Sequence, residues 1–341
     1  MKVLVTGSAG FIGFSVTKML INENIDVVGI DNINSYYDVK LKQSRVNKLK
    51  QISNKSKSEF KFYKFDICDQ KKLKNVILKN KINYIIHLAA QAGVRHSIKK
   101  PHDYIESNIK GFMNILEEAR YNKIQHLLFA STSSVYGLNA KIPSKEKDNT
   151  DYPIQLYAAT KKSNELMAHA YSYLYKLQIT GMRFFTVYGP WGRPDMALFK
   201  FVKSIYDNKP VEIFNFGNHK RNFTYIDDIC KRIVYLLKKK SKVSKINKNK
   251  TENSVPFEIY NIGSEKSTSL LKFIELIEKN LNKKSKKKFL KKQLGDVVQS
   301  KACMKKFIKV SKIKSYTSIE QGIKNFIDWY KLYYLNNKMK N

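Results

Sequence analysis

The sequence predicts an α/β protein built on a Rossmann-type, doubly wound parallel sheet that is completed by a smaller α+β region. Three observations lead to this prediction. Runs rich in β-forming residues alternate with helical apolar patterns through the first half of the chain. The first run leads through a glycine-rich turn into a helix. The length of 341 residues is enough for two domains and a large buried core.

The glycine-rich turn, GSAGFIG at residues 7–13, directly follows the expected first strand at residues 2–6. Strand, glycine turn and helix in this order are typical of a dinucleotide site. We expect Gly7 to form the tight turn, Gly10 to let a pyrophosphate approach the backbone, and Gly13 to let the helix pack closely. The helix N-terminus would then face the phosphates. An ordinary β-turn-α junction is the alternative.

An acidic residue at the end of the second expected strand, residues 26–30, indicates which dinucleotide binds. Asp31 follows that strand, about twenty residues beyond the glycines. A carboxylate at this place binds ribose hydroxyls and repels a 2′-phosphate. The sequence therefore favours NAD over NADP.

Polar or small residues follow each of the next strands, which we expect at residues 60–65, 84–88 and 127–131. Asp66 ends the first of them, Ala89 and Ala90 follow the second, and a cluster of hydroxyls at residues 131–134 follows the third. Ligands of parallel sheets bind at the carboxyl ends of the strands. We therefore expect these residues at the binding site, although hydroxyls are also common in plain turns.

Tyr157 and Lys161 lie four residues apart on a helix expected at residues 154–175, so their side chains share one face. An ammonium group beside a phenol should lower the pKa of the phenol. Such a phenol can act as the base for a sugar or alcohol hydroxyl. The same spacing also arises by chance in a lysine-rich chain with 21 tyrosines.

The composition is that of a globular protein with a large positive charge: 43% of the residues are hydrophobic and the net charge is +36. Such a charge is compatible with nucleic-acid binding. The lysine-rich runs at residues 238–250 and 283–292, however, lack a pattern of interleaved aromatic residues that would stack on bases. We therefore expect solvated lysines and no nucleic-acid partner, with a field that helps to collect anionic ligands.

Three cysteines, Cys68, Cys230 and Cys303, are far apart and lack the spacing of metal ligands. This usage fits a reducing compartment without disulfides or a bound metal. The first residues run straight into a strand, which leaves no room for a signal sequence, and no apolar run is long enough to span a bilayer. We expect a cytoplasmic protein without a membrane partner.

These motifs resemble the extended short-chain dehydrogenase/reductases, which share the TGSAGFIG start, the VYG after the hydroxyl cluster and the tyrosine–lysine pair. Longer stretches are similar to the bacterial UDP-glucuronate 4-epimerases of capsule and cell-wall synthesis. They are DNINSYYD (31–38), HLAAQAGVR (87–95), YAATKKSNELMA (157–168), RFFTVYGPWGRPDMALFKF (183–201) and RNFTYIDD (221–228). The resemblance covers nearly the whole chain apart from the lysine-rich runs.

The resemblance implies an NAD-dependent isomerase that interconverts UDP-glucuronate and UDP-galacturonate through a transient 4-keto sugar, with NAD tightly bound. It implies that Tyr157 takes the proton of the 4-hydroxyl, that Lys161 supports the phenolate and binds the nicotinamide ribose, and that Thr132 hydrogen-bonds the same hydroxyl. The implied cofactor contacts are Gly7, Gly10, Phe11, Ile12, Gly13, Asp31, Asn32, Asp66, Ile67, Leu88, Ala89, Ala90, Asn108, Tyr157 and Lys161.

The implied substrate contacts are Arg95, Thr132, Ser133, Ser134, Thr186, Arg193, Arg221 and Asp296. Of these, Arg221 would bind the pyrophosphate and Asp296 the ribose. Arg193 would bind the uronate carboxylate with Thr186 and the hydroxyl cluster, but it could instead be a structural arginine that pairs with Asp195. Arg95 would bind an anion, with a surface salt bridge as its alternative.

The resemblance also implies an NAD-binding domain over residues 1–180 and a mainly substrate-binding region over residues 181–341, interleaved with the first. Family members form homodimers through two long helices, expected here at residues 101–120 and 154–175. Two positions depart from the family pattern: Val298 replaces a proline, and Cys303 replaces an aspartate that opens a helix, which would cost about 1 kcal/mol.

Ser133 and Ser134 distinguish the chain from related dehydratases, which carry an Asp-Glu pair there, and from decarboxylases, which carry a glutamate at the second position. Two other functions remain open at this point. A 4-epimerase of UDP-N-acetylhexosamines or UDP-hexoses would use the same catalytic residues, and a non-enzymatic NAD-binding or nucleic-acid-binding protein would have no need of them.

Overall fold

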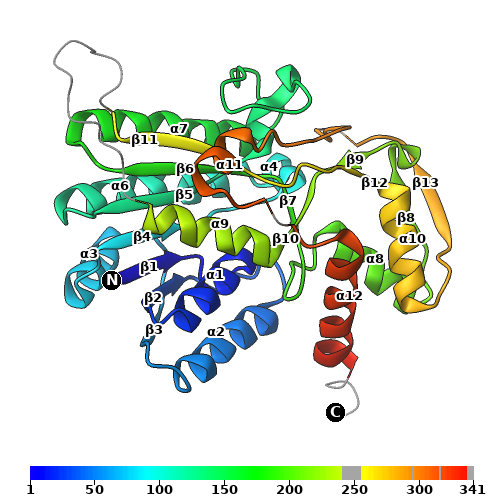
Figure 1. The fold of residues 1–341 in the computed structure, drawn as a ribbon, viewed down its shortest axis with the longest axis horizontal. Coiled ribbons are helices and arrows are strands. Elements are labelled where there is room, and N and C mark those ends of the chain that lie inside the picture. The colour runs from blue at the N-terminus through cyan, green and yellow to red at the C-terminus, as the bar shows by residue number, and fades with distance from the viewer. Residues whose placement is uncertain (240–254, 294, 315, 336–341) are drawn as a thin grey trace.

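A seven-stranded parallel sheet forms the centre of the computed structural model, which describes residues 1–239, 255–293, 295–314 and 316–335 (Figure 1). The strand order is β11-β6-β5-β4-β1-β2-β3. The strands are β1 (Lys2–Thr6), β2 (Asp26–Asp31), β3 (Phe60–Lys64), β4 (Tyr84–His87), β5 (His126–Thr132), β6 (Ile179–Phe184) and β11 (Phe257–Ile262). The order reverses next to β1, which confirms the predicted doubly wound sheet. The five strands expected from sequence lie within one residue of their predicted bounds.

Helices cover both faces of the sheet because alternate strand residues are apolar on both sides. Val3 and Val5 point to one core with α1 (Phe11–Asn22), α2 (Val39–Ser53) and α9 (Ile226–Lys238). Leu4 points to the other core with α3 (Gln70–Asn80), α6 (Gly111–Tyr121) and α7 (Leu156–Tyr175). The sheet is therefore closed to water on both faces, and only its ends are open to ligands.

The single helix expected at residues 101–120 is wrong in detail. It consists of α5 (Pro101–Tyr104), a π-helical segment η1 (Ile105–Lys110) and α6, and a short helix α4 (Val94–Lys99) precedes it. The wider turn of η1 places Asn108 toward the loop after β4, where its Oδ1 accepts from the backbone N of Gln91 at 2.8 Å. Apolar periodicity does not distinguish a π-helical turn from an α-helical one, because both keep a buried face.

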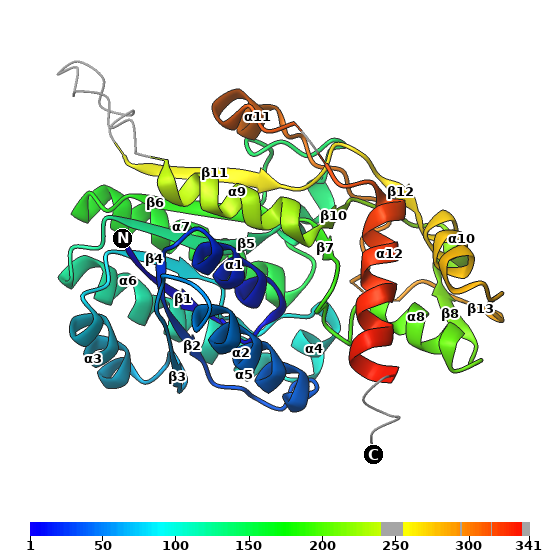
Figure 2. The ribbon, with the colours of Figure 1, turned by 60° about the horizontal axis from the view of Figure 1, so that its bottom comes forward.

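The smaller region lies beyond one end of the sheet (Figure 2). It contains α8 (Ala197–Tyr206), α10 (Leu270–Leu281) and α12 (Ile319–Tyr330), with the π-helical η4 (Lys331–Leu335) after α12. The helix α11 (Lys305–Ser311) packs against the sheet instead, where the Phe307 ring contacts that of Tyr260 on β11. The strand pairs of the smaller region are β7 (Thr186–Tyr188) with β10 (Phe223–Tyr225), β8 (Val211–Phe214) with β13 (Lys287–Leu290), and β9 (Lys220–Arg221) with β12 (Thr268–Ser269). The short 3₁₀ segments are η2 (Ser133–Asn139) and η3 (Asn215–Gly217). Because α9 and β11 return to the sheet, no single point of the chain separates the two regions.

Arg45 on α2 connects the two regions. Its side chain is fully buried, and it donates through Nη1 to the carbonyl of Ala9 at 2.9 Å and through Nη2 to that of Trp191 at 2.5 Å. The Trp191 ring packs against Phe14 of α1 and Trp329 of α12, with centroid distances of 5.1 and 5.5 Å. This contact therefore joins the glycine-rich turn to the segment that follows β7.

The expectations for the lysines and for Cys303 have mixed outcomes. Of the lysine-rich run at residues 238–250, all but the first two residues lie outside the described residues. In the second run, at residues 283–292, the Lys284 side chain is 93% exposed. Cys303 does not open a helix: α11 begins at Lys305, and Met304 is its N-cap without a side-chain bond. The backbone N of Cys303 instead donates to Ser144 at 2.9 Å. The expected helix start was wrong because pairing with another segment extends the chain there.

Val298 is 43% exposed, and its carbonyl accepts from the backbone N of Lys220, so this departure is accommodated at a strand edge. All three cysteines are free. Among the described residues, no helix is both long and apolar enough to cross a membrane. Within the same residues, no cluster of three metal-binding side chains occurs.

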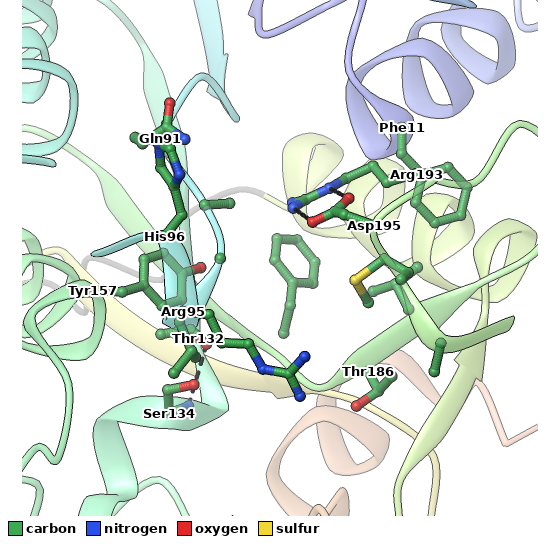
Figure 3. A pocket seen from close by; sticks show the side chains of 18 of the residues that line it. Phe11, Gln91, Arg95, His96, Thr132, Ser134, Tyr157, Thr186, Arg193 and Asp195 are labelled. Atoms are coloured by element: carbon green, nitrogen blue, oxygen red, sulfur yellow. Dashed lines mark hydrogen bonds and ion pairs between the residues drawn. The ribbon is translucent and has the colours of Figure 1, made fainter. Parts of the chain in front are cut away.

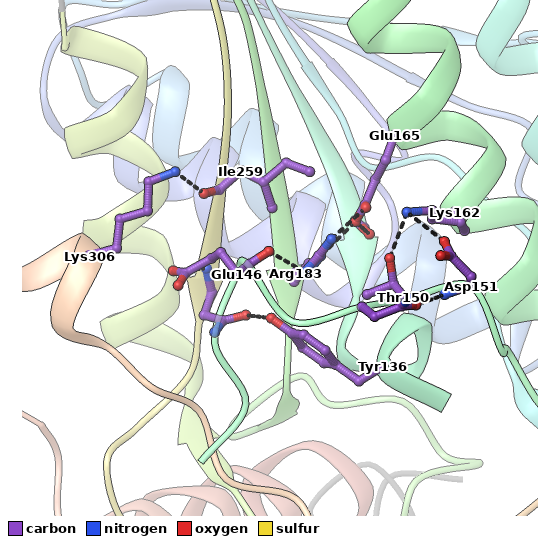
Figure 4. Close-up of polar contacts among 12 residues, drawn as sticks. Tyr136, Glu146, Thr150, Asp151, Lys162, Glu165, Arg183, Ile259 and Lys306 are labelled. Atoms are coloured by element: carbon purple, nitrogen blue, oxygen red, sulfur yellow. Dashed lines mark hydrogen bonds and ion pairs between the residues drawn. The ribbon is translucent and has the colours of Figure 1, made fainter. Parts of the chain in front are cut away.

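A buried ion pair joins β6 to α7 (Figure 4). Arg183 donates to both oxygens of Glu165, through Nε at 2.8 Å and through Nη2 at 2.7 Å, and both side chains are 3% exposed. Ser131 at the end of β5 donates to Oε1 of Glu165 at 2.6 Å. One carboxylate thus fixes three elements that meet at the end of the sheet.

We predict that Glu165→Gln lowers the free energy of unfolding by about 3 kcal/mol, because it leaves the Arg183 charge buried without its partner. Urea unfolding at neutral pH measures this change. Glu275→Gln is the matched control, since its ion pair with Lys272 is exposed and should contribute less than about 0.5 kcal/mol. Equal effects of the two variants would contradict the assignment of a structural role to the buried pair.

Candidate functional site

A cavity of about 1330 Å³ opens at the carboxyl ends of the parallel strands, between the sheet and the smaller region. Of the site residues expected from sequence, all but Asn108 line it: Gly7, Gly10, Phe11, Ile12, Gly13, Asp31, Asn32, Asp66, Ile67, Leu88, Ala89, Ala90, Arg95, Thr132, Ser133, Ser134, Tyr157, Lys161, Thr186, Arg193, Arg221 and Asp296. Residues almost three hundred positions apart in sequence therefore share one cavity.

The glycine-rich turn forms one end of the cavity in a conformation that only small residues allow. Gly7 has a φ of +72°, and a Cβ on it would lie 2.8 Å from the backbone N of Ala89. A Cβ on Gly13 would lie 2.0 Å from the carbonyl oxygen of Gly7. The helix α1 therefore packs against the turn itself, and the backbone around the N-terminus of α1 stays open to the cavity.

Two carboxylates lie beside this turn. Asp31 accepts from the backbone N of Ala9 at 3.1 Å and from that of Ile33 at 2.8 Å. Burial raises the pKa of Asp31, and the bonds from these two amides and the charge of Lys42 offset part of this rise. Asp66 accepts from the Asn32 side chain at 2.7 Å. Both carboxylates are thus held at the carboxyl ends of β2 and β3.

Asn108 is the one expected cofactor contact that does not line the cavity. It is 1% exposed, and its amide nitrogen donates to the carbonyl of Gln91 and to Thr160, each at 3.1 Å. Together with the bond from Gln91 N, these contacts occupy the amide group. Asn108 therefore holds the loop after β4 in place without itself lining the cavity.

Tyr157 and Lys161 come from the first turns of α7 and line the cavity. Figure 3 shows Tyr157 at the cavity wall. Burial raises the pKa of Tyr157, although the Thr132 side chain and the charge of Arg193 act in the opposite direction. The expectation that Lys161 lowers this pKa is wrong, because the pKa is raised and burial is its largest cause. Lys161 is itself 1% exposed, and burial lowers its pKa to about 8. Its charge acts instead on the buried His87, whose pKa is lowered chiefly by burial.

The hydroxyl cluster stands next to this pair. Thr132 ends β5 and accepts through Oγ1 from the backbone N of Ser134 at 3.2 Å, which caps the short η2 segment. Figure 3 shows Tyr157, Thr132 and Ser134 on one side of the cavity and Thr186 and Arg193 on the other. A ligand between these walls would meet a phenol, hydroxyls and a guanidinium group.

Arg193 forms an ion pair with Asp195, which is the alternative that the sequence left open for this residue. Its Nε lies 3.0 Å from Oδ1 of Asp195, and its Nη2 lies 2.5 Å from Oδ2. The guanidinium nevertheless lines the cavity, with 19% of the side chain exposed. The ion pair and the position at the cavity are therefore compatible.

At the far end of the cavity Arg95, Arg221 and Asp296 gather. Nη2 of Arg95 lies 3.7 Å from Oδ2 of Asp296, and half of the Arg95 side chain is exposed. Its guanidinium carbon lies 5.0 Å from the centroid of the Phe214 ring. Arg221 keeps Nη1 buried without a partner in the described part of the chain. The site thus brings two guanidinium groups and one carboxylate together where an elongated ligand would end.

Several residues of the cavity were missed by sequence reasoning. Tyr36, His96, Gln155 and His219 line it. Only Tyr36 lay in a motif, DNINSYYD, that could have indicated it. The others approach through loop contacts, such as the bond that Gln155 donates to the carbonyl of Gly295, and such contacts between distant segments leave no local pattern.

The fold and the cavity define a Rossmann-type protein with a dinucleotide cradle continuous with a second ligand site. The profile of the NAD dependent epimerase/dehydratase family matches residues 3–263, and the chain belongs to this family. Staphylococcus aureus protein CapI is 47% identical over 338 residues, which are 98% of this chain and 99% of CapI. Arabidopsis thaliana UDP-glucuronate 4-epimerase 4 is 41% identical over 341 residues, which are 98% of this chain and 76% of that protein.

A solved structure is similar over the whole fold. The UDP-glucuronic acid 4-epimerase of Bacillus cereus, in complex with UDP-glucuronic acid and NAD, superposes with a TM-score of 0.87 at 33% sequence identity. The match covers 98% of this chain and 100% of that chain.

We predict that Lys161→Met stabilises the protein, once bound ligands are stripped from it, at pH 7 by roughly 3 kcal/mol, because a charge that burial disfavours is removed. A lysine of the unfolded chain titrates near 10.4, above the value of about 8 in the fold. The buried charge therefore lowers the free energy of unfolding by its full amount below pH 8, and this effect disappears as the pH rises toward 10.4. The extra stability of Lys161→Met should vanish over the same range.

Urea unfolding of protein stripped of ligand, at several pH values, measures this gain. Lys162→Met is the matched control, because Lys162 donates to Thr150 at 2.6 Å and its removal should give no gain. A loss of stability in Lys161→Met at pH 7 would show that the ammonium group is not a cost to the fold.

Proposed function

We propose that the chain is a UDP-glucuronate 4-epimerase, which interconverts UDP-glucuronate and UDP-galacturonate with NAD tightly bound. One observation carries the proposal: Tyr157, Lys161 and Thr132 share one cavity with a glycine cradle and with Arg193 on the opposite wall. A base, a cofactor site and an anion site are the parts that this reaction needs. The relatives named for this reaction match the chain over almost all of its length.

The residues of the cavity fit NAD. The glycine-rich turn leaves room for a pyrophosphate at the N-terminus of α1, and Asp31 stands where ribose hydroxyls bind. The Lys161 side chain is 1% exposed and lines the cavity, and a ribose hydroxyl would supply an acceptor for its ammonium group. When bound, NAD supplies a reversible hydride acceptor.

We assign proton transfer to Tyr157. The phenolate would take the proton of the sugar 4-hydroxyl while Thr132 holds that hydroxyl by a hydrogen bond, and Lys161 would support the negative charge. Because burial raises the pKa of Tyr157, ionisation of the phenol depends on the positive groups around it. The 4-keto sugar would then rotate in the cavity, so that its opposite face takes back the hydride that left C4, and Tyr157 would return the proton to O4.

We assign the remaining polar residues to the UDP-sugar. Arg221 would bind the pyrophosphate through its planar fork, and Asp296 would bind the uridine ribose. Arg193, Thr186 and the hydroxyls of Ser133 and Ser134 would bind the uronate carboxylate, and Arg95 would add positive charge near the phosphates. All of these side chains line the same cavity.

Ser133 and Ser134 limit the outcome of the reaction. A 4-keto uronate is a β-keto acid and loses carbon dioxide readily, and a carboxylate held firmly by hydroxyls and Arg193 resists this loss. Neither serine can act as a strong acid or base for eliminating water. Epimerisation therefore remains as the reaction that these residues support.

A second candidate is a 4-epimerase of UDP-hexoses or UDP-N-acetylhexosamines. It is favoured by the ion pair of Arg193 with Asp195, in which the carboxylate balances the charge of the guanidinium group. A non-enzymatic binding protein is less well supported, because it would need neither Tyr157 nor Lys161. Relative rates on UDP-glucuronate, UDP-glucose and UDP-N-acetylglucosamine separate the first two.

We predict that the purified protein converts UDP-glucuronate to UDP-galacturonate without added NAD. Tyr157→Phe should lower the rate by about 10²–10⁴-fold, because it removes the proton-transferring group. NMR spectroscopy of the reaction mixture measures both. Turnover of neutral UDP-sugars alone would favour the second candidate, and abundant UDP-pentose would contradict the proposed hold on the carboxylate. If no UDP-sugar is converted even with NAD supplied, both proposed epimerase activities are contradicted.

We further propose a cytoplasmic homodimer that pairs through α6 and α7. The three free cysteines fit a reducing compartment. The two helices pack on each other, where Tyr171 donates to Glu117 at 2.6 Å. Large apolar side chains are exposed on them, namely Met113, Tyr121, Leu166, Tyr173, Leu174 and Tyr175. A second copy of the chain would cover this surface.

We predict that Leu166→Glu raises the dissociation constant of the dimer at least about tenfold, because a charge would be buried in the interface. Light scattering coupled to size-exclusion chromatography measures the mass over a range of concentrations. Leu332→Glu is the control, since Leu332 is 66% exposed on η4 at another part of the molecule. A monomeric parent protein would contradict the proposed homodimer.

A further inference from the structure

Arg193 uses only one edge of its guanidinium group for Asp195. Nε and one hydrogen of Nη2 point at the two carboxylate oxygens, at 3.0 and 2.5 Å. A guanidinium group has five N–H donors, so both hydrogens of Nη1 and one of Nη2 are left over. Apart from the Tyr36 hydroxyl, they meet no acceptor in the described part of the chain, and the group lines the cavity. The remaining edge has the geometry that binds a carboxylate with two parallel bonds.

Asp195 is itself held by a residue from the opposite half of the molecule. The hydroxyl of Tyr36 donates to Oδ2 of Asp195 at 3.2 Å, across 159 positions of sequence. Arg193 also lies over the Tyr36 ring, 5.6 Å from its centroid. Burial and the Asp195 charge raise the pKa of Tyr36 to about 12, so the hydroxyl keeps its proton near neutral pH and can donate.

Neighbouring residues leave little room around the Tyr36 hydroxyl. A Cβ on Gly93 would lie 2.4 Å from the hydroxyl oxygen of Tyr36. The Tyr36 ring packs against the His96 ring, with 4.7 Å between the ring centroids. Tyr36 also follows Asp31 in the same loop, so the segment next to the proposed cofactor ribose reaches the proposed carboxylate site. The close approach of Gly93, the packing on His96 and the bond to Asp195 therefore define the position of this phenol group.

We propose that Tyr36 and Asp195 are specificity-determining positioning residues, which fix Arg193 with its open edge toward the sugar so that the cavity selects a uronate. The inference rests on the proposed function, because it takes the ligand of that edge to be the C6 carboxylate of the substrate. A free guanidinium would have to order its side chain on binding, which costs conformational entropy. The neutral hydroxymethyl group of a UDP-hexose gains little from a fixed guanidinium edge. Loss of Tyr36 or Asp195 should therefore weaken the binding of the uronate more than that of the neutral sugar.

Binding to the NAD-loaded protein tests the proposal without turnover if Tyr157→Phe is the parent. Calorimetry with UDP-glucuronate, UDP-glucose and UDP gives three dissociation constants for each variant. Asp195→Asn should weaken UDP-glucuronate about tenfold or more, since charge-assisted contacts are disturbed. Tyr36→Phe should weaken it about threefold to tenfold. UDP and UDP-glucose should change less than about threefold in either variant.

Tyr37→Phe is the matched control. Its hydroxyl accepts from Arg45 at 2.7 Å, and no hydrogen bond joins it to Asp195 among the described residues, so the ratio of the constants should stay that of the parent. Parallel weakening of all three ligands in Asp195→Asn would show a merely structural role and overturn the proposal. Tighter binding of UDP-glucuronate would overturn it too, because Asp195 would then be a competitor for Arg193.

The same titrations separate this proposal from the proposed function. A parent that binds UDP-glucuronate no more tightly than UDP-glucose would contradict the uronate assignment, and the positioning role would fall with it. A parent that prefers UDP-glucuronate, with variants that keep this preference unchanged, would leave the function standing and refute the positioning role alone.

Discussion

The buried ion pair of Glu165 with Arg183 is the contact on which the geometry of the cavity depends. Glu165 lies one helical turn beyond Lys161 on α7, and its carboxylate also accepts from Ser131, the residue before Thr132. One group therefore holds the backbone segments that carry the phenol, the ammonium and the hydroxyl of the site. Because both charges are out of water, an incomplete pair is strongly disfavoured. The relative positions of these three side chains are consequently a property of the core.

A second buried arginine has a comparable effect on the two walls of the cavity. Arg45 bonds to carbonyls of the glycine-rich turn and of the segment before Arg193. Aromatic packing of Trp191 against α1 and α12 surrounds the same place. The cofactor cradle and the proposed sugar site are thus parts of one rigid frame. Precise spacing between two bound ligands, which hydride transfer needs, follows from this frame.

Most of the sheet and of the site could be predicted from the sequence, because their signals are local. The strands alternate with helices, the glycines occupy a short turn, and Tyr157 and Lys161 share one helix face. The π-helical turn at Asn108 and the start of α11 could not be predicted, since each is decided by contact with a distant segment. The pKa of Tyr157 was also misjudged, because spacing on a helix does not report how deeply the phenol is buried.

Lys161 gives the protein an unusual dependence on its proposed cofactor. Its side chain is 1% exposed and burial lowers the pKa of its ammonium group to about 8, so holding the charge in the fold is costly, and a bound ribose hydroxyl would offset that cost. Anything that binds only the folded state stabilises it by mass action. The dinucleotide would then also serve as a folding partner, and the lifetime of the chain against proteolysis would follow the cellular supply of that nucleotide.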